Sequence, residues 1–271
     1  MEMTTPNLGN QLNQVVQAAR SALFVQGELA QLSYSAFGLA AEAVKENHEE
    51  NLEITYPVGY TPDRNAIPLT RNYAKEELLQ RYHFLTHTQL GVNAVFQLVT
   101  IIEAMLSDVL RATVIRYPQK LGAKRTIPIQ SILESATLEE VHLKATDALI
   151  NELSFKSPND YAAALDSLIS VNLLECVAFH KYIEVKAARD IYIHNRGIAN
   201  DVYVRKAGSH ARVKANNYLP IDNVYFLQSY EYCLQVTEWL EQELHNHWHS
   251  SDLEARSQPQ LSLPALGDVT V

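Results

Sequence analysis

The stretch that decides the fold class is SPNDYAAALDSLISVNLLECVAFHKYIEVKAARDIYIHNRG, residues 157–197. Its start, Ser157 followed by Pro158, is typical of a helix N-terminus, because proline is well tolerated in the first helical turn. Apolar residues then recur at helical spacing as far as about His194, and Gly197 stands where a helix is expected to end. The pattern therefore predicts one long helix from about Ser157 to about His194. Its apolar series consists of Leu165, Leu168, Ile169, Leu173, Leu174, Val177 and Tyr182.

Four other stretches show the same periodicity and indicate that most of the chain is helical. They are residues 10–45, 73–117, 138–153 and 220–247. The second stretch holds a continuous apolar stripe that ends at Pro118, and Gly91 within it indicates a kink or a break into two helices. The sequence therefore predicts an all-α fold, a bundle of four to five core helices in which strand is a minor component.

The segments between the predicted helices are rich in turn-forming or polar residues. Residues 53–70 contain three prolines and a glycine, which predicts a loop with at most a short extended piece at Ile54 and Tyr56. Residues 200–218 are polar and basic, and residues 202–204 favour a short extended segment. We therefore divide the chain into a helical N-terminal extension with a loop (1–70), the helical bundle (71–250) and a tail (251–271) that we expect to be disordered.

The composition favours a cytoplasmic protein without a membrane segment. The chain has 271 residues, of which 47% are hydrophobic, and this suffices for a substantial buried core. No stretch approaches the roughly 20 consecutive apolar residues that span a bilayer, and residues 1–13 lack the layout of a secretory signal. Cys176 and Cys233 lie far apart within apolar helical patterns, which favours buried thiols in a reducing compartment.

Charge is distributed unevenly along the chain. The formal net charge is −9, which disfavours a general nucleic-acid coat protein. Residues 186–214 nevertheless contain seven Lys and Arg residues against two Asp residues, so that this segment carries +5 and the remainder −14. The segment is either a local phosphate-binding surface on an acidic protein or an ordinary solvated loop.

The polar end of the long predicted helix holds the best candidates for a functional site. Arg189 and His194 are five positions apart, about 140° around an ideal helix, so they do not share a face. They can converge if the last turn unwinds near Gly197. Cations near a helix C-terminus also stabilise the helix by themselves, so the spacing is compatible with a purely structural role.

The same residues resemble the Rx4–6H motif of HEPN domains, in which a polar residue follows the arginine (here Asp190) and the histidine (here Asn195). The segment ARDIYIHNRG, residues 188–197, is similar to the signature of bacterial HEPN proteins from toxin–antitoxin and phage-defence systems. The helical layout of about residues 75–248 is similar to that family as well. The resemblance implies a homodimer in which two motifs form one composite ribonuclease site.

The chemistry of RNA cleavage suits these residue types. RNA supplies its own nucleophile, the 2′-hydroxyl, so a proton-transfer group and a cation suffice. We expect His194 to transfer protons and Arg189 to bind the scissile phosphate, giving a 2′,3′-cyclic phosphate and a 5′-hydroxyl. Asp190 and Asn195 would orient these side chains or contact the RNA. Peripheral phosphate contacts are expected from Arg196, Arg205 and Lys206.

Glu103 interrupts the apolar stripe of residues 73–117. A carboxylate there is expected either to pair with Arg189 and hold its rotamer, or to lie at the edge of the core and reach water. We expect no metal and no cofactor. His83 and His87 are four residues apart, but no glutamate lies between them as in HExxH zinc sites.

The leading hypothesis is therefore a metal-independent endoribonuclease, a possible toxin or phage-defence effector that acts on RNA as a homodimer. An antitoxin or other regulatory protein is a further expected partner. HEPN proteins paired with a nucleotidyltransferase antitoxin often have a tyrosine two positions after the histidine, where this chain has Arg196. The alternative is a catalytically silent HEPN-like module that binds RNA or a protein and dimerises.

Overall fold

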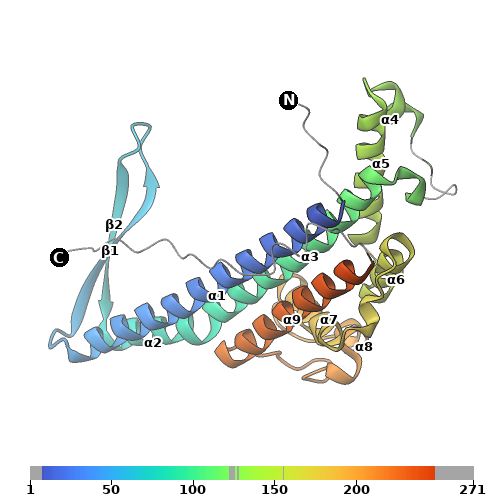
Figure 1. Ribbon diagram of the computed structural model, residues 1–271. Helices are drawn as coiled ribbons and strands as arrows, with labels where there is room; N and C mark the ends of the chain where they lie inside the picture. Colours follow the sequence, from blue (N-terminus) through green and yellow to red (C-terminus); the bar gives the residue numbers. More distant parts are fainter. Residues whose placement is uncertain (1–7, 122–125, 127, 155, 248–271) are drawn as a thin grey trace.

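The computed structural model describes residues 8–121, 126, 128–154 and 156–247 (Figure 1). The described part is mostly helical, which confirms the predicted fold class in its coarse form. The predicted tail, residues 251–271, lies outside the described residues. The helices are α1 (Leu8–Glu46), α2 (Lys75–Phe84), α3 (Leu90–Arg116), α4 (Ile129–Leu133), α5 (Leu138–Ser154), α6 (Pro158–Ile169), α7 (Val177–Asn195), α8 (Asp201–Ala207) and α9 (Asn223–His247), and the strands are β1 (Asn51–Tyr60) and β2 (Ala66–Ala74).

The core forms where α1 and α3 lie side by side and α9 and α7 pack beneath them (Figure 1). Leu12 and Leu23 of α1 are fully buried, as are Leu98 and Ile102 of α3. Apolar side chains on one face of each helix therefore remove each other from water, which is the main driving force for this arrangement. Helix α1 thus shares one hydrophobic core with the bundle.

The prediction of a single helix from Ser157 to His194 is wrong, because the chain breaks between α6 and α7. Ser157 does cap α6, accepting a hydrogen bond from the Asp160 N–H at 3.2 Å. The helix ends at Ser170, which has a left-handed conformation with φ 59°. The side chain of Asn172 then accepts a hydrogen bond from the Leu174 N–H at 3.2 Å and starts a 3-10 turn. Val171 and Leu173, which lie in the break, are fully buried. The apolar pattern of the sequence therefore continues across the break, and hydrophobic spacing alone does not reveal that the helix ends there.

Residues 53–70 are largely a β-hairpin, where the sequence predicted a loop. Strands β1 and β2 pair antiparallel with Pro57 opposite Pro68, and a bulge lies between Pro57 and Gly59. The hairpin projects from the end of the α1–α2 pair (Figure 1). Each strand of a two-stranded ribbon has a free edge, so proline can be placed without removing a hydrogen bond between the strands.

Two further expectations about local structure need correction. Residues 202–204 belong to α8 and are not extended, because Asn200 caps this helix by accepting a hydrogen bond from the Tyr203 N–H at 2.9 Å. The irregularity predicted at Gly91 lies just before it, in a π-helical turn at Leu85–Gln89. Gly91 itself allows a close approach, because a Cβ there would come within 3.3 Å of the Asp222 carbonyl oxygen.

Within the described ranges, no helix is both long and apolar enough to cross a membrane.

Candidate functional site

The end of α7 is fixed by a tight turn. Arg196 adopts a left-handed conformation with φ 52°, and the Gly197 N–H bonds back to the Ile191 carbonyl at 3.3 Å. Gly197 has φ 81°, and a Cβ there would lie 2.9 Å from the Tyr218 ring, so glycine is required on two grounds. Asn195 donates from Nδ2 to the Ile198 carbonyl and thereby braces the same turn.

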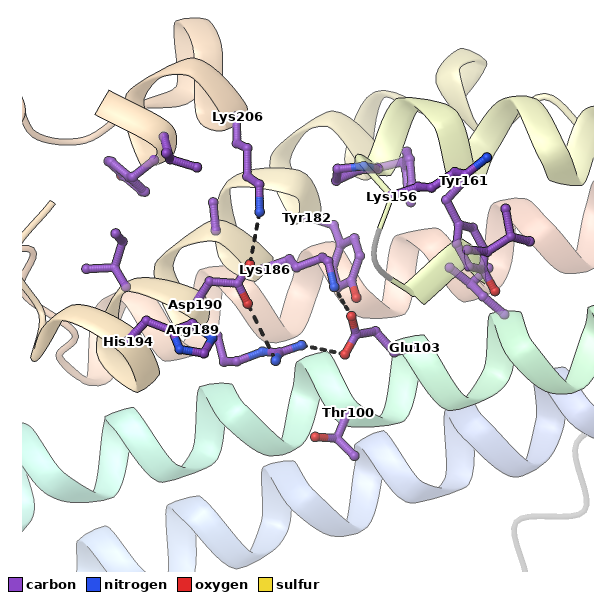
Figure 2. A pocket seen from close by; sticks show the side chains of 18 of the residues that line it. Thr100, Glu103, Lys156, Tyr161, Tyr182, Lys186, Arg189, Asp190, His194 and Lys206 are labelled. Carbon is purple, nitrogen blue, oxygen red and sulfur yellow. Dashed lines mark hydrogen bonds and ion pairs between the residues drawn. The ribbon is translucent and has the colours of Figure 1, made fainter. Parts of the chain in front are cut away.

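Arg189 and His194 line one cavity of about 770 Å³, which is walled by α3, α7 and α8 and by the start of α6 (Figure 2). Helix α7 stays helical up to Asn195, so the unwinding expected from the sequence is not what brings them together. The two side chains leave α7 at positions about 140° apart around the helix axis, and both reach the cavity. Asp190 lies between them on the helix surface and lines the same cavity.

A chain of alternating charges holds Arg189 in place. Glu103 of α3 accepts hydrogen bonds from Lys186 Nζ and from Arg189 Nη2. Asp190 Oδ1 lies 3.5 Å from Arg189 Nη1, and Asp190 Oδ2 accepts a hydrogen bond from Lys206 Nζ at 3.2 Å. Figure 2 shows this series from Glu103 through Arg189 and Asp190 to Lys206. Of the two expectations for Glu103, the structure has the pair with Arg189, although the Glu103 side chain remains 38% exposed.

The cavity wall is more positive than the chain as a whole. Besides Glu103 and Asp190, the charged groups that line it are the cations Lys156, Lys186, Arg189 and Lys206. The pKa of Lys186 is lowered to about 8, mainly by burial, with Asp190 raising it and Arg189 and Lys206 lowering it. A site with this surplus of cations favours an anionic ligand.

The buried hydroxyl of Tyr161, which also lines the cavity, lies near Ser107 but makes no hydrogen bond of ordinary geometry to the part of the chain that the structure describes. Two further buried polar atoms beside the cavity have no hydrogen-bond partner among the described residues: Tyr182 Oη and Arg189 Nε. Tyr182 is only 2% exposed, and burial raises the pKa of its hydroxyl well above the ordinary value, so it stays protonated. Buried polar groups are normally hydrogen-bonded, and each exception calls for an explanation such as an unseen ligand or water. Both atoms therefore have unused hydrogen-bonding capacity beside the cavity.

The residues expected to contact RNA at the periphery separate into two groups. Lys206 lines the cavity. Arg196 and Arg205 are exposed and are absent from the cavity wall that the described residues form. The sequence analysis missed Lys156, Lys186 and Tyr182 as site residues. Lys186 was within reach of sequence reasoning, because it precedes Arg189 and Asp190 by three and four residues and so shares their helix face.

Comparison of the chain with protein-family models, curated proteins and solved structures yields no match. The relation to HEPN proteins therefore stays a prediction from the motif. The described residues contain no group of three or more His, Cys, Asp or Glu side chains placed to hold a metal ion.

Proposed function

We propose that this protein is a metal-independent endoribonuclease whose site contains Arg189 and His194. The observation that carries the proposal is that both side chains line a single cation-rich cavity, with Arg189 held by carboxylates on two sides. An arginine with a fixed rotamer is preorganised to bind a phosphate, and preorganised charge is usually the largest contribution to catalysis of this kind.

The reaction requires two proton transfers. The 2′-oxygen attacks the adjacent phosphorus as a base takes its proton, and the bond from phosphorus to the 5′-oxygen breaks as an acid protonates that oxygen. The products are a 2′,3′-cyclic phosphate and a 5′-hydroxyl. One histidine cannot be base and acid at the same moment, so the proposal includes a homodimer in which His194 of each copy serves one transfer. Arg189 stabilises the charge on the non-bridging phosphate oxygens.

The motif is of the kind found in toxin–antitoxin and phage-defence settings, so we place the protein there as a cytoplasmic effector controlled by an antitoxin or another regulatory protein. Arg196 at the position of the often modified tyrosine argues against control by a nucleotidyltransferase.

A second candidate function is a silent module that binds RNA or protein. One observation favours it: Glu103 and Asp190 both pair with Arg189 and partly neutralise the charge that a phosphate would meet. In an active enzyme these carboxylates hold the arginine in the orientation that binds the phosphate. In a silent module they stay paired with the arginine and keep it from binding a phosphate.

Cleavage of a defined RNA by wild type, Arg189→Ala and His194→Ala separates the two functions. Each substitution should lower the rate by at least about 10²-fold, because general acid–base catalysis alone contributes about 10²–10⁴-fold. Stability should fall by only about 1 kcal/mol, since His194 is exposed in the last turn of α7 and the two carboxylates that pair with Arg189 stay partly exposed to solvent. His210→Ala is the matched control, because His210 is exposed in the same basic segment but does not line the cavity formed by the described residues.

Wild-type cleavage should persist in EDTA and leave cyclic phosphate ends. Equal cleavage by wild type and His194→Ala, at unchanged helicity, would support the silent module. Activity that EDTA removes and magnesium restores would exclude the proposed mechanism.

A further inference from the structure

We propose that the inner part of the cavity binds one nucleotide of the RNA, with the base inserted beyond the cleavage site. This inference rests on the proposed function and adds a substrate subsite to it. The cavity volume, about 770 Å³, is within the range of about 300–1,000 Å³ typical of small-ligand sites. In Figure 2, His194 lies at one end of the cavity and Tyr161 and Lys156 at the other, with Lys186, Glu103 and Tyr182 between them.

The two ends differ in chemistry. The end near His194 carries Arg189 and Lys206, which suit a phosphate. The opposite end has an apolar wall of Leu106, Leu153 and Pro158 beside the Tyr161 ring. An apolar slot with an aromatic ring suits the face of a base, because every base can stack on an aromatic side chain.

The hydroxyl of Tyr182 supports the assignment of the apolar end of the cavity as a binding site. This hydroxyl is buried between the two ends and has no hydrogen-bond partner among the described residues. A buried hydroxyl without a hydrogen bond destabilises the fold, and a base edge or a ribose hydroxyl would supply the missing bond. Lys156 at the far end pairs with Glu152 at 2.7 Å, and the remaining N–H groups of its ammonium can supply a second donor.

Binding of single nucleotides tests the subsite without requiring cleavage. The four nucleoside 3′-monophosphates, the corresponding nucleosides and inorganic phosphate are titrated by calorimetry into wild type, Tyr182→Phe and Tyr34→Phe. At least one nucleotide should bind more tightly than phosphate or its nucleoside alone. Tyr182→Phe should weaken it about fivefold, which corresponds to one neutral hydrogen bond of about 1 kcal/mol.

Tyr34→Phe is the matched control, since Tyr34 also has a buried hydroxyl without a partner among the described residues, but on α1 outside the cavity. It should bind as wild type does. Equal affinity of wild type and Tyr182→Phe, or phosphate binding as tight as nucleotide binding, would overturn the subsite. Nucleotide binding without RNA cleavage would keep the subsite and refute the nuclease, and cleavage without nucleotide binding would do the reverse.

A second inference comes from a different surface. We infer that the outward face of α1 pairs with the same face of a second copy in an antiparallel coiled coil. This contact is separate from the composite-site contact of the proposed function, because none of the described residues that line the cavity of Arg189 and His194 belongs to α1. The outer stripe of α1 consists of Ala18, Ala22, Val25, Leu29, Leu32, Ala36, Leu39 and Ala43, and all eight are exposed. Val25, Leu29, Leu32 and Leu39 are 57–73% exposed.

The spacing of the outer stripe alternates between four and three residues over more than three heptads. This is the seam pattern of a coiled coil, and it is separate from the buried face that packs on α3. The stripe is about 38 Å long at 1.5 Å per residue. A contiguous exposed apolar surface of this length marks an interaction site.

The stripe is complementary to itself in the antiparallel direction. With Leu29 of one copy level with Leu32 of the other, Val25 meets Ala36, Ala22 meets Leu39, and Ala18 meets Ala43. Val25 and Leu39 then face alanines, Leu29 faces Leu32 at the centre, and Ala18 faces Ala43 at the two ends, so the inner part of the seam can pack closely. Parallel pairing in register would instead put Ala22 on Ala22 and Ala36 on Ala36 within the seam, leaving voids between layers of larger residues.

Two neighbouring features support the second copy as the partner. A groove of about 500 Å³ beside Ala18 and Ala22, between α1 and α3, lies where Leu39 of the second copy would arrive. The acidic flanking residues Glu28 and Glu42 face Ser35 and Ser21 of the second copy, so no like charges meet.

Val25→Glu and Val224→Glu form a matched pair, because both valines are 63% exposed, one on the outer stripe and one on α9. Light scattering at tens of micromolar should give Val224→Glu the same mass as wild type and Val25→Glu a smaller mass, because the α1 contact is lost. Equal masses for wild type and Val25→Glu would overturn the inference.

Cross-linking tests the direction of pairing. A mixture of Ala22→Cys and Leu39→Cys chains should form disulfide-linked dimers under mild oxidation, because these positions are level in the antiparallel register. Neither variant alone should do so, since its two cysteines would lie about 25 Å apart at 1.5 Å per residue. Cross-linking of Ala22→Cys by itself would show parallel pairing and refute the register.

Discussion

Glu184 and Lys186 stand two residues apart on α7 and therefore point to opposite sides of the helix, where charged groups surround them in different ways. Glu184 is 4% exposed and accepts hydrogen bonds from Tyr203 Oη at 2.7 Å and Tyr225 Oη at 2.8 Å. The guanidinium of Arg212 completes the group, with Nε 3.3 Å from Glu184. Lys186 instead belongs to the charged wall of the cavity.

The difference separates a structural cluster from a cluster that can bind a ligand. The Glu184 cluster ties α7 to α8 and α9, and both carboxylate oxygens accept bonds from protein groups. Arg212 also donates from Nη1 to the Pro220 carbonyl at 2.8 Å and lies over the Tyr225 ring. The cavity cluster has donors without partners among the described residues and borders an open volume. Arg212, although part of the basic segment, therefore has a structural role.

The largest difference in stability between the two clusters is expected when the carboxylate of each is removed. Glu184→Ala should lower the free energy of unfolding by roughly 2–5 kcal/mol, because the buried hydroxyls of Tyr203 and Tyr225 both lose their acceptor. Arg212 loses its carboxylate partner but keeps the Pro220 carbonyl. Glu103→Ala should lower the free energy of unfolding by only about 1 kcal/mol, since its side chain is 38% exposed and solvent screens the pair. Urea denaturation of both variants measures this. Equal losses would mean that the cavity cluster is also structural.

The helices that the sequence predicted best are those with long, one-sided apolar patterns. Helices α1, α5 and α9 follow their predicted ranges within a few residues, because burial of one face largely determines a helix of that length. The break between α6 and α7 was hidden because Val171 and Leu173 are buried and continue the pattern. Local hydrogen bonds decide such a break, and hydrophobic periodicity does not report them.

The hairpin and α8 escaped prediction for other reasons. The prolines of the hairpin look like loop residues, and only the pairing of the two strands shows that they are tolerated. Helix α8 has seven residues and depends on the Asn200 cap and on burial of Tyr203, so propensity alone gives little signal.

The candidate site was partly predictable. The motif itself identified Arg189 and His194, and a lone acid in an apolar stripe made Glu103 a candidate partner. Lys156 and Tyr182 reach the cavity only through the packing of α6 and α7 against α3, which no local pattern encodes.

Lys186 is expected to make the stability of the protein depend on pH, which is a smaller effect than the loss of Glu184. This pH dependence again distinguishes the cavity side of α7 from the Glu184 side. Burial lowers its pKa to about 8 in the folded protein from an ordinary value of 10.5. Between these values the unfolded chain binds a proton that the folded chain does not, so the stability of wild type should rise with pH across this window. The cost of burying the ammonium is fully present below pH 8 and is relieved as the pH rises.

Lys186→Met removes the titrating group, so the stability of wild type relative to this variant should rise by about 1–2 kcal/mol from pH 7.5 to pH 10, with partial screening by solvent taken into account. Taking the difference between the two proteins cancels the titration of Cys233 and of the buried tyrosines, which are common to both. Urea denaturation at pH 7.5, 8.5, 9.5 and 10 measures the trend. Parallel curves would mean that the contact of Lys186 with Glu103 outweighs burial and keeps the ammonium charged, which would make this pair a closed structural interaction like that of Glu184.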